Sequence, residues 1–312
     1  MPELPEVEYT ARQLREHLIG ATISEALVFW ERTIGHPDLP DFLAEIAGQS
    51  IVGVRRRGKF LVLDLKRAGY PDADFILTIH RRMTGNLLLL PPGWEVDMSL
   101  QKRDPVAWNI RGPSFKWQGQ GETESGTHHC RVCFNLADGR CLLFTDPRKF
   151  GRIALWPREQ ESQALKGLGA EPLSDEFTVE RLVQALAGRK GAIKQALLAQ
   201  DVIAGMGNIY ADEALFYAAI HPLRRANSLT RDEVELLHTG IVSVLTLGIE
   251  HGGTSFSEYR DLWGEAGDNY NHVRVYHQQG QACVRCGTPV ERIVVGQRST
   301  HFCPNCQKLI QG

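Results

Sequence analysis

Three features are scarce or missing in this sequence: long hydrophobic runs, an excess of positive charge, and cysteines in a disulfide pattern. No apolar run approaches the roughly 18 residues that a membrane helix needs, and the amino terminus lacks the basic and apolar regions of a secretion signal. The seven cysteines are an odd number in a chain with no sign of secretion, which argues against a disulfide framework. We therefore expect a cytoplasmic protein that does not enter a membrane.

The charge balance excludes a uniformly basic protein, because 35 lysines and arginines stand against 37 acidic residues and the net charge is −2. Any nucleic-acid footprint must then be local. Two such concentrations exist: residues 51–69 carry six basic residues against Asp64 alone, and residues 271–312 carry five against Glu291 alone. With 312 residues, 43% of them apolar, the chain is long enough for two domains with substantial cores.

The first eight residues, MPELPEVE, combine two prolines with three carboxylates. Removal of Met1 would give Pro2 a free α-amino group with a pKa of about 7.7–8, which is a ready nucleophile for a carbonyl carbon. The carboxylate of Glu3 would stand beside it to shuttle protons. The alternative is a helix start, with Pro5 in the first turn and acids near the positive end of the helix.

The apolar pattern changes period twice along the chain. Residues 7–18 form a helical stripe that ends before Gly20, and short alternating runs follow. Short strands separated by turns indicate an antiparallel sandwich or barrel. Beyond a polar segment at 157–172 the period becomes helical again. The expected strands are 26–29, 50–54, 60–65, 75–79, 87–90, 130–136 and 141–145.

The helical half contains one clear start signal, because Thr230 and Glu233 have the spacing of a capping box. Between the expected strands, residues 91–129 break the rhythm, and we expect a long surface excursion there. Cys130 and Cys133 follow it, and in a strand they would point to opposite faces, so we reject a metal site at this pair.

Three loops between the expected strands carry unusual side chains. The turn at Lys59 holds several cations, which suits either a solvated turn or a phosphate contact. Met83 lies in a turn between two apolar strands, where it would be either exposed or a wedge for a partner. Phe150 stands among three cations in the loop 146–152, and an apolar wedge of this kind can unstack nucleic-acid bases.

Residues 205–213, GMGNIYADE, place two glycines and Asn208 before a helical stretch. Asn208 is a suitable helix cap, and backbone amides at a helix start can bind phosphate, although the two glycines are equally consistent with a tight turn.

The carboxyl-terminal region has the spacing of a structural zinc site. Two Cys-x2-Cys pairs, Cys283 with Cys286 and Cys303 with Cys306, are separated by sixteen residues. Four thiolates fill the tetrahedral shell of zinc and leave no open position, so we predict one structural zinc ion. Arg298 lies on the hairpin expected between the pairs, where its guanidinium can reach a phosphate.

Taken together, these stretches resemble the formamidopyrimidine-DNA glycosylase family, to which endonuclease VIII also belongs. The resemblance runs from Pro2 to about Lys308 and rests on PELPEVE, RRRGK at 55–59, DPRKFG at 146–151, GMGNIYADEALF at 205–216 and the cysteine pairs. It implies an α+β fold with an antiparallel β-sandwich and flanking helix, then a helical domain with a helix–two-turn–helix element and a zinc-finger hairpin. The implied domains are 1–156, a linker at 157–172, a helical domain with a lesion-recognition loop at 173–275, and a finger at 276–312.

The family resemblance also implies an activity on damaged double-stranded DNA. The damaged base is flipped out of the stack, Pro2 attacks C1′ and displaces it, and the Schiff base then drives cleavage of the strand by β,δ-elimination. Glu3 is the implied proton shuttle and Glu6 supports the site. The implied DNA contacts are Lys59, Asn208 and Arg298 on phosphates, Lys194 near the lesion, and Met83, Arg148 and Phe150 in the gap left by the flipped base.

The start PELPEVE and the long 253–277 segment favour enzymes that remove 8-oxoguanine and formamidopyrimidines in base excision repair. The alternatives are an endonuclease VIII-like enzyme for oxidised pyrimidines, or a DNA-binding relative without catalysis. The resemblance further implies a bacterial monomer that associates with the nucleoid.

Overall fold

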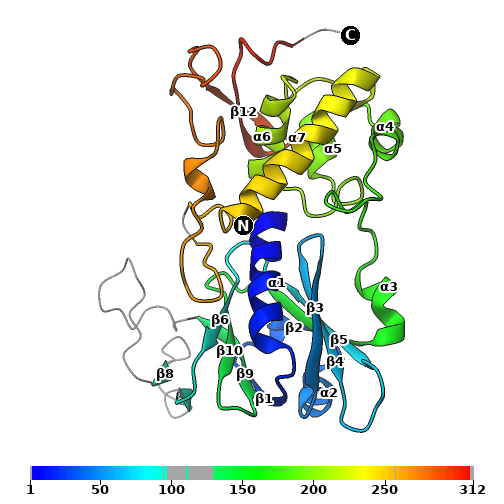
Figure 1. Cartoon of the computed structure of the whole chain (residues 1–312), viewed down its shortest axis with the longest axis vertical. Coiled ribbons are helices and arrows are strands. Elements are labelled where there is room, and N and C mark those ends of the chain that lie inside the picture. Colours follow the sequence, from blue (N-terminus) through cyan, green and yellow to red (C-terminus); the bar gives the residue numbers. More distant parts are fainter. Residues whose placement is uncertain (1, 94, 97–109, 112–128, 257, 310–312) are drawn as a thin grey trace. The chain divides into compact units, whose positions relative to one another are not determined.

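The computed structural model describes residues 2–93, 95–96, 110–111, 129–256 and 258–309 (Figure 1). The chain divides into two compact units. Unit 1 comprises Met1–Pro2, Glu6–Lys166 and Thr254–Gly267, and unit 2 comprises Glu3–Pro5, Gly167–Gly253 and Asp268–Gly312. Most of the excursion expected at 91–129 lies outside the described residues. Among the described helices, none is long and apolar enough to cross a membrane.

Helix α1 spans Leu4–Leu18, so the helix start that was the alternative interpretation of the first eight residues is present. Pro5 fits there because the first amides of a helix have no partner within the helix. From its second turn onward α1 packs a fully buried stripe, Val7, Ala11 and Leu14, into the core of unit 1.

Unit 1 is built on two sheets, with strand orders β1-β9-β10-β6 and β2-β11-β5-β4-β3. Both contribute to one core cluster that includes Leu63, Leu77 and Phe134, so they form the predicted sandwich. The pairing is antiparallel except between β2 and β11, which run parallel. The main strands are β1 (Ile23–Val28), β2 (Ile34–His36), β3 (Ser50–Arg57), β4 (Phe60–Lys66), β5 (Phe75–His80), β6 (Asn86–Leu90), β9 (Cys130–Leu136), β10 (Cys141–Thr145) and β11 (Arg152–Pro157).

The short elements of unit 1 lie between and after these strands. They are η1 (Glu31–Thr33), α2 (Leu39–Ile46), β7 (Glu95–Val96), β8 (Ile110–Arg111), η4 (Arg158–Gln160) and α3 (Glu161–Ala164).

A bulge in β9 overturns one expectation from the sequence. Along β10 the register passes from Phe144 opposite Val132 to Thr145 opposite Cys130, so one residue of β9 is skipped. The extra residue reverses the alternation of side chains beyond it. Cys130 and Cys133 therefore lie in the same buried cluster, and the prediction that they point to opposite faces is wrong.

Unit 2 is largely helical and packs around helix α6, whose residues from Ile209 to Phe216 are all buried, whereas Tyr217 at its end is exposed. The capping box predicted at Thr230 and Glu233 is confirmed at the start of α7. The carboxyl-terminal hairpin pairs β12 with β13. The elements are α4 (Val179–Ala187), α5 (Ile193–Leu198), α6 (Asn208–Tyr217), η5 (Ala226–Ser228), α7 (Arg231–Glu250), η6 (Asn269–Asn271), β12 (Glu291–Val295) and β13 (Arg298–Phe302).

Candidate functional site

The side chain of Glu3 lies at the amino end of α6 in unit 2. Its Oε1 accepts a hydrogen bond from the Ile209 amide at 3.2 Å, and the next residue, Leu4, donates its amide to the Gly205 carbonyl at 3.1 Å. A helix amino terminus stabilises a negative charge through its exposed amides and its dipole. The backbone cradle predicted at residues 205–213 thus holds the carboxylate of Glu3 in this structure.

Two glycines make this arrangement possible. A Cβ at Gly207 would lie 2.1 Å from the carboxylate carbon of Glu3, so no side chain fits at this position. Gly205 has φ +90°, and a Cβ there would also lie 2.8 Å from the Leu4 side chain. The Gly-Met-Gly motif therefore leaves room for residues 3 and 4.

Asn208 begins α6 but does not cap it, because the cap residue is Gly207 and no side-chain cap bond forms. The expected cap is therefore wrong. Instead, Asn208 Nδ2 donates to the Ser299 carbonyl at 2.9 Å and lies 3.5 Å from the Tyr276 hydroxyl. Its amide ties the start of α6 to the hairpin strand β13.

Lys194 is completely buried, and its ammonium contacts three acceptors inside unit 2. Nζ lies 2.6 Å from Asp212 Oδ1, 2.9 Å from the Ser299 carbonyl and 2.8 Å from Thr300 Oγ1. Burial lowers the pKa of Lys194, and the nearby carboxylate of Asp212 opposes that effect. The ammonium predicted to lie near a lesion or its phosphate thus joins α5 to α6 and to β13.

The hairpin presents Arg298 immediately after a two-residue turn. Gly296 and Gln297 have φ +55° and +62°, the left-handed pair that joins antiparallel strands tightly. Arg298 is exposed at the first position of β13. Because Lys194 and Asn208 both donate to the Ser299 carbonyl, three of the predicted DNA contacts meet around one strand end.

In unit 1, Lys59 lies in the tight turn between β3 and β4, where Gly58 has φ +56°. Its charge affects His80 on β5. Burial first, then the charges of Arg82 and Lys59, lower the pKa of His80 to about 3, so this imidazole is neutral near pH 7. The neutral Nδ1 accepts the Arg82 amide at 3.0 Å and helps to fix the turn before Met83.

The loop with Phe150 and the turn with Met83 are joined by Asp146. Its carboxylate accepts the Thr84 hydroxyl, the Arg148 amide at 3.2 Å and the Gly151 amide at 2.7 Å. Phe150 is 48% exposed, and the Arg148 guanidinium lies 5.0 Å from its ring centroid. The structure therefore brings the three residues predicted to fill a base gap onto two loops that share a hydrogen bond.

Glu6 holds one end of the segment Thr254–Gly267 within unit 1. Its Oε1 accepts the Thr254 amide at 2.8 Å. The fully buried Arg81 holds the same segment by donating to the Arg260 carbonyl at 3.1 Å, and it also donates to Thr10 Oγ1 at 2.8 Å. Burial lowers the pKa of Arg81.

Four buried charged residues were missed by sequence reasoning: Arg81, Asp146, Asp212 and Glu213. Glu213 accepts the amides of residues 274, 275 and 276 at 2.8–2.9 Å, and Asp212 accepts the His301 amide at 2.9 Å. The only available signal was their place within or beside motifs already noted.

The predicted site residues divide between the units. Unit 1 contains Pro2, Glu6, Lys59, Met83, Arg148 and Phe150, and unit 2 contains Glu3, Lys194, Asn208 and Arg298.

The four cysteines predicted to bind zinc come together in unit 2, and their Sγ atoms all lie within 4.8 Å of one another. Cys283 and Cys306 are 3.9 Å apart, and Cys286 and Cys303 are 3.5 Å apart. Tetrahedral zinc with Zn–S bonds of about 2.3 Å requires sulfur atoms roughly 3.8 Å apart. The amides of Arg285 and Cys306 each donate to a cysteine sulfur at 3.4 Å, which is suited to a charged thiolate. The residues therefore fit a structural zinc ion.

Three family models match successive parts of the chain. Residues 1–153 match the formamidopyrimidine-DNA glycosylase N-terminal domain, residues 168–260 match the formamidopyrimidine-DNA glycosylase H2TH domain, and residues 280–309 match a zinc finger found in FPG and IleRS. These three regions in this order define a DNA glycosylase with a carboxyl-terminal zinc finger.

Individual relatives match over the whole chain. The formamidopyrimidine-DNA glycosylase of Roseiflexus sp. is 40% identical, covering 99% of this chain and 100% of its own length. That of Enterococcus faecalis is 39% identical, covering 99% and 98%. The chain belongs to the formamidopyrimidine-DNA glycosylase family.

Solved structures of Lactococcus lactis Fpg have the same fold. A complex with DNA containing an abasic site superposes with a TM-score of 0.81 at 31% identity, covering 98% of this chain and 100% of that one. A complex with Fapy-dG DNA has a TM-score of 0.79 at 31% identity. A complex with DNA that contains an oxidised pyrimidine has a TM-score of 0.80 at 32% identity.

Proposed function

We propose that this DNA glycosylase of base excision repair removes oxidised purines from duplex DNA, using Pro2 as the nucleophile, and then cleaves the strand as an AP lyase. The observation that carries the proposal is the fixed carboxylate of Glu3, which α6 holds next to Pro2 in the chain. Gly207 leaves no space for another side chain there. A free proline amine beside a fixed carboxylate is a nucleophile with its own proton carrier.

The chemistry follows from these two groups. The nitrogen of Pro2 forms a bond to C1′ of the flipped nucleotide while the bond from C1′ to the base breaks, and the base leaves with a proton. The C1′–O4′ bond then breaks as O4′ takes up a proton and the Pro2 nitrogen loses its own, which opens the sugar and gives an iminium between C1′ and that nitrogen. The resulting iminium withdraws electrons from the sugar, so the C2′ proton becomes acidic and its loss expels the 3′ phosphate. A second elimination expels the 5′ phosphate. In this scheme Glu3 moves the protons that these steps release and consume, and Glu6 fixes Thr254 in its place.

The other predicted residues are proposed to hold the DNA. Arg298 is exposed at the tip of the hairpin, where it is available to a phosphate. Lys59 and Asn208 also contact phosphates, whereas Lys194 acts by positioning Ser299 and therefore Arg298. Met83, Arg148 and Phe150 fill the space of the flipped base, because an exposed ring next to a cation can stack on bases.

We propose a corresponding division of labour along the chain. Residues 1–156 form the catalytic sandwich, and residues 157–172 link it to the helical domain. Residues 173–275 form that domain with its lesion-recognition loop, and residues 276–312 form the zinc finger. The ranges of the three family models, 1–153, 168–260 and 280–309, support this division. Because the relatives named above are bacterial, we also propose that the protein works on the bacterial nucleoid in the cytoplasm.

Borohydride trapping tests the proposal. Untagged protein is mixed with a duplex that contains one 8-oxoguanine opposite cytosine, reduced, digested and examined by mass spectrometry. We expect a covalent sugar adduct on the nitrogen of Pro2. A duplex with an oxidised pyrimidine is tested in parallel, because a Lactococcus lactis relative was solved with such DNA. Protein with a confirmed proline terminus that traps neither lesion nor an abasic site would be a binding protein without catalysis.

A further inference from the structure

Two histidines and an aspartate form a second group of metal-ligand side chains in unit 2, outside the four cysteines. One ligand atom from each of His251, Asp268 and His272 lies within 4.8 Å of the other two. His251 directly follows α7, and the other two residues flank the short helix η6. None of the three has a role in the proposed chemistry.

The backbone fixes where these residues meet. The Asp268 amide donates to the His251 carbonyl at 2.8 Å, and the Asn269 amide donates to the Gly253 carbonyl at 3.1 Å. The chain leaves unit 2 after Gly253 and returns to it at Asp268. The cluster therefore lies where the two ends of the segment Thr254–Gly267 are joined.

The side chains are arranged in a way that suits a metal ion. Asn271 Nδ2 donates to Asp268 Oδ1 at 2.6 Å, while Oδ2 lies 3.6 Å from His272 Nε2. A hydrogen bond to the other carboxylate oxygen is the usual support of a metal ligand. The rings of His251 and His272 are stacked with centroids 3.6 Å apart, and one nitrogen of each lies within 4.8 Å of the other, so a turn of one ring is needed for both to bind one ion.

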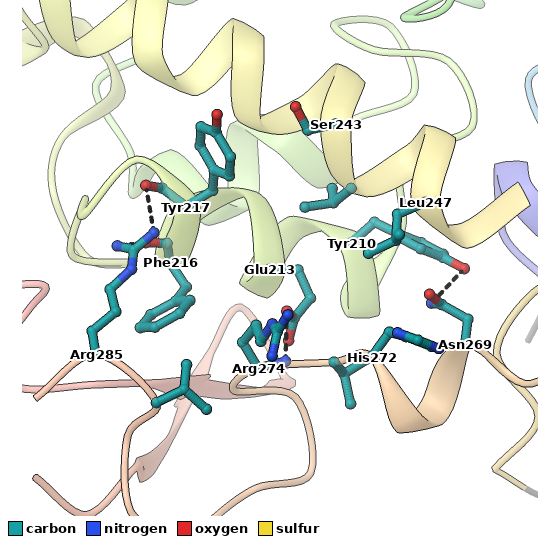
Figure 2. A pocket seen from close by; sticks show the side chains of 13 residues that line it. Tyr210, Glu213, Phe216, Tyr217, Ser243, Leu247, Asn269, His272, Arg274 and Arg285 are labelled. Carbon is teal, nitrogen blue, oxygen red and sulfur yellow. Dashed lines mark hydrogen bonds between the residues drawn. The ribbon is translucent and has the colours of Figure 1, made fainter. Parts of the chain in front are cut away.

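Figure 2 shows His272 beside Asn269 at one end of a cavity of about 260 Å³ in unit 2. The Asn269 amide lies 3.5 Å from the Tyr210 hydroxyl of α6, which anchors the short helix between Asp268 and His272. The ligand-bearing segment is thus attached to the buried centre of unit 2, whereas the side chains of Asp268 and His272 remain 60% and 33% exposed.

We propose that His251, Asp268 and His272 bind a divalent transition-metal ion such as zinc, separately from the four-cysteine site. Two imidazoles and one carboxylate are the ligands of zinc sites that keep an open position. Ligand atoms around zinc at bond lengths of about 2.1 Å are roughly 3.4 Å apart. The ligand atoms within 4.8 Å must therefore come closer, by rotation of the exposed Asp268 side chain and adjustment of the two half-buried imidazoles.

The bound ion would fasten the two ends of the segment Thr254–Gly267 to each other. Residues before and after the segment supply ligands to the same ion, so opening of the two backbone hydrogen bonds between them would require its release. The amides of Asp268 and Asn269 would then exchange more slowly with solvent when the ion is bound.

The test is a binding measurement on the full-length protein with zinc already in the four-cysteine site. Equilibrium dialysis against micromolar free zinc, followed by elemental analysis, is expected to show a second equivalent of bound zinc per chain in the natural protein. His272→Ala and His251→Ala should each lose that equivalent and keep the first. Asp268→Asn, which preserves the size of the side chain, should weaken the second site without removing the first.

His17→Ala is the matched control, because it removes a histidine from α1 in unit 1 and should keep both equivalents. Cobalt(II) added to the zinc-loaded protein should give weak visible bands without thiolate charge transfer, since no sulfur belongs to the proposed site. A single equivalent in the natural protein would overturn the proposal and leave a surface ion pair of little energetic weight. A second equivalent that survives in His272→Ala, or bands from thiolate ligands alone, would also overturn it.

Discussion

The carboxylate of Glu3 occupies the space that a side chain at Gly207 would need, because a Cβ there would lie 2.1 Å from the Glu3 carboxylate carbon. This relationship joins the amino terminus to a motif two hundred residues away in the sequence. It also explains why the motif before α6 contains glycine. A substitution at Gly207, which carries no reactive group, can therefore be used to displace Glu3.

Gly207→Ala should therefore reduce excision strongly while every reacting group remains present. The added methyl must displace Glu3 from the Ile209 amide, and misplacement of a catalytic group by about 1 Å can cost roughly 100-fold in rate. Single-turnover excision measures the loss. Gly188→Ala is the control, since a Cβ there has nothing within 4 Å, and it should retain full activity. Equal activity of the two variants would mean that the position of Glu3 is unimportant.

Glu3→Gln should leave binding to lesion DNA largely intact and lower base excision by about 10²–10⁴-fold, the usual contribution of a positioned acid or base. The amide oxygen of glutamine can still accept from the Ile209 amide, so the geometry is kept and only the proton transfer is lost. Gel-shift affinity and excision rate are measured on the same duplex. Unchanged excision would remove Glu3 from the proton-transfer step.

Lys194→Met should destabilise the protein by about 3–5 kcal/mol, because it leaves the buried carboxylate of Asp212 without its cation. Denaturant unfolding gives the free energy. The double variant Lys194→Met with Asp212→Leu should regain part of the loss, although the His301 amide then lacks its acceptor. A single variant as stable as the natural protein would contradict the buried ion pair.

Phe150→Ala should leave the free energy of unfolding within about 0.5 kcal/mol of the natural value, since the ring is 48% exposed. It should weaken binding to lesion duplex, because the ring is proposed to fill the gap of the flipped base. Binding to single-stranded DNA, which has no such gap, is the control measurement. A loss of stability instead would assign the ring to the fold.

His80 should make the unfolding free energy depend on pH between about 6.5 and 3. Its pKa falls from an unfolded value near 6.5 to about 3 in the fold, so in this window the unfolded chain binds more protons. Stability is therefore lost as pH falls through the window, and the effect is absent above it. His80→Asn can still accept the Arg82 amide. It should lower the slope of unfolding free energy against pH, because the difference in bound protons between the unfolded and folded states falls by somewhat less than one. Identical slopes would show that His80 titrates normally.

Sequence patterns predicted helices and strands well where neighbouring residues specify them. The strands expected at 130–136 and 141–145 match β9 and β10, because alternation and flanking turns specify them. The bulge that places Cys130 and Cys133 on one face was missed, since it depends on the register of the partner strand.

The same division holds for the candidate site. The sequence by itself determined the cysteine spacing, the glycines before α6 and the place of Pro2 and Glu3 directly after Met1, because each depends on residue type and short-range spacing. Only the tertiary structure decided that Lys194 forms an ion pair with Asp212 and that the amino end of α6 holds Glu3. Buried charges must find partners wherever the fold provides them, and those partners lie far apart in the sequence.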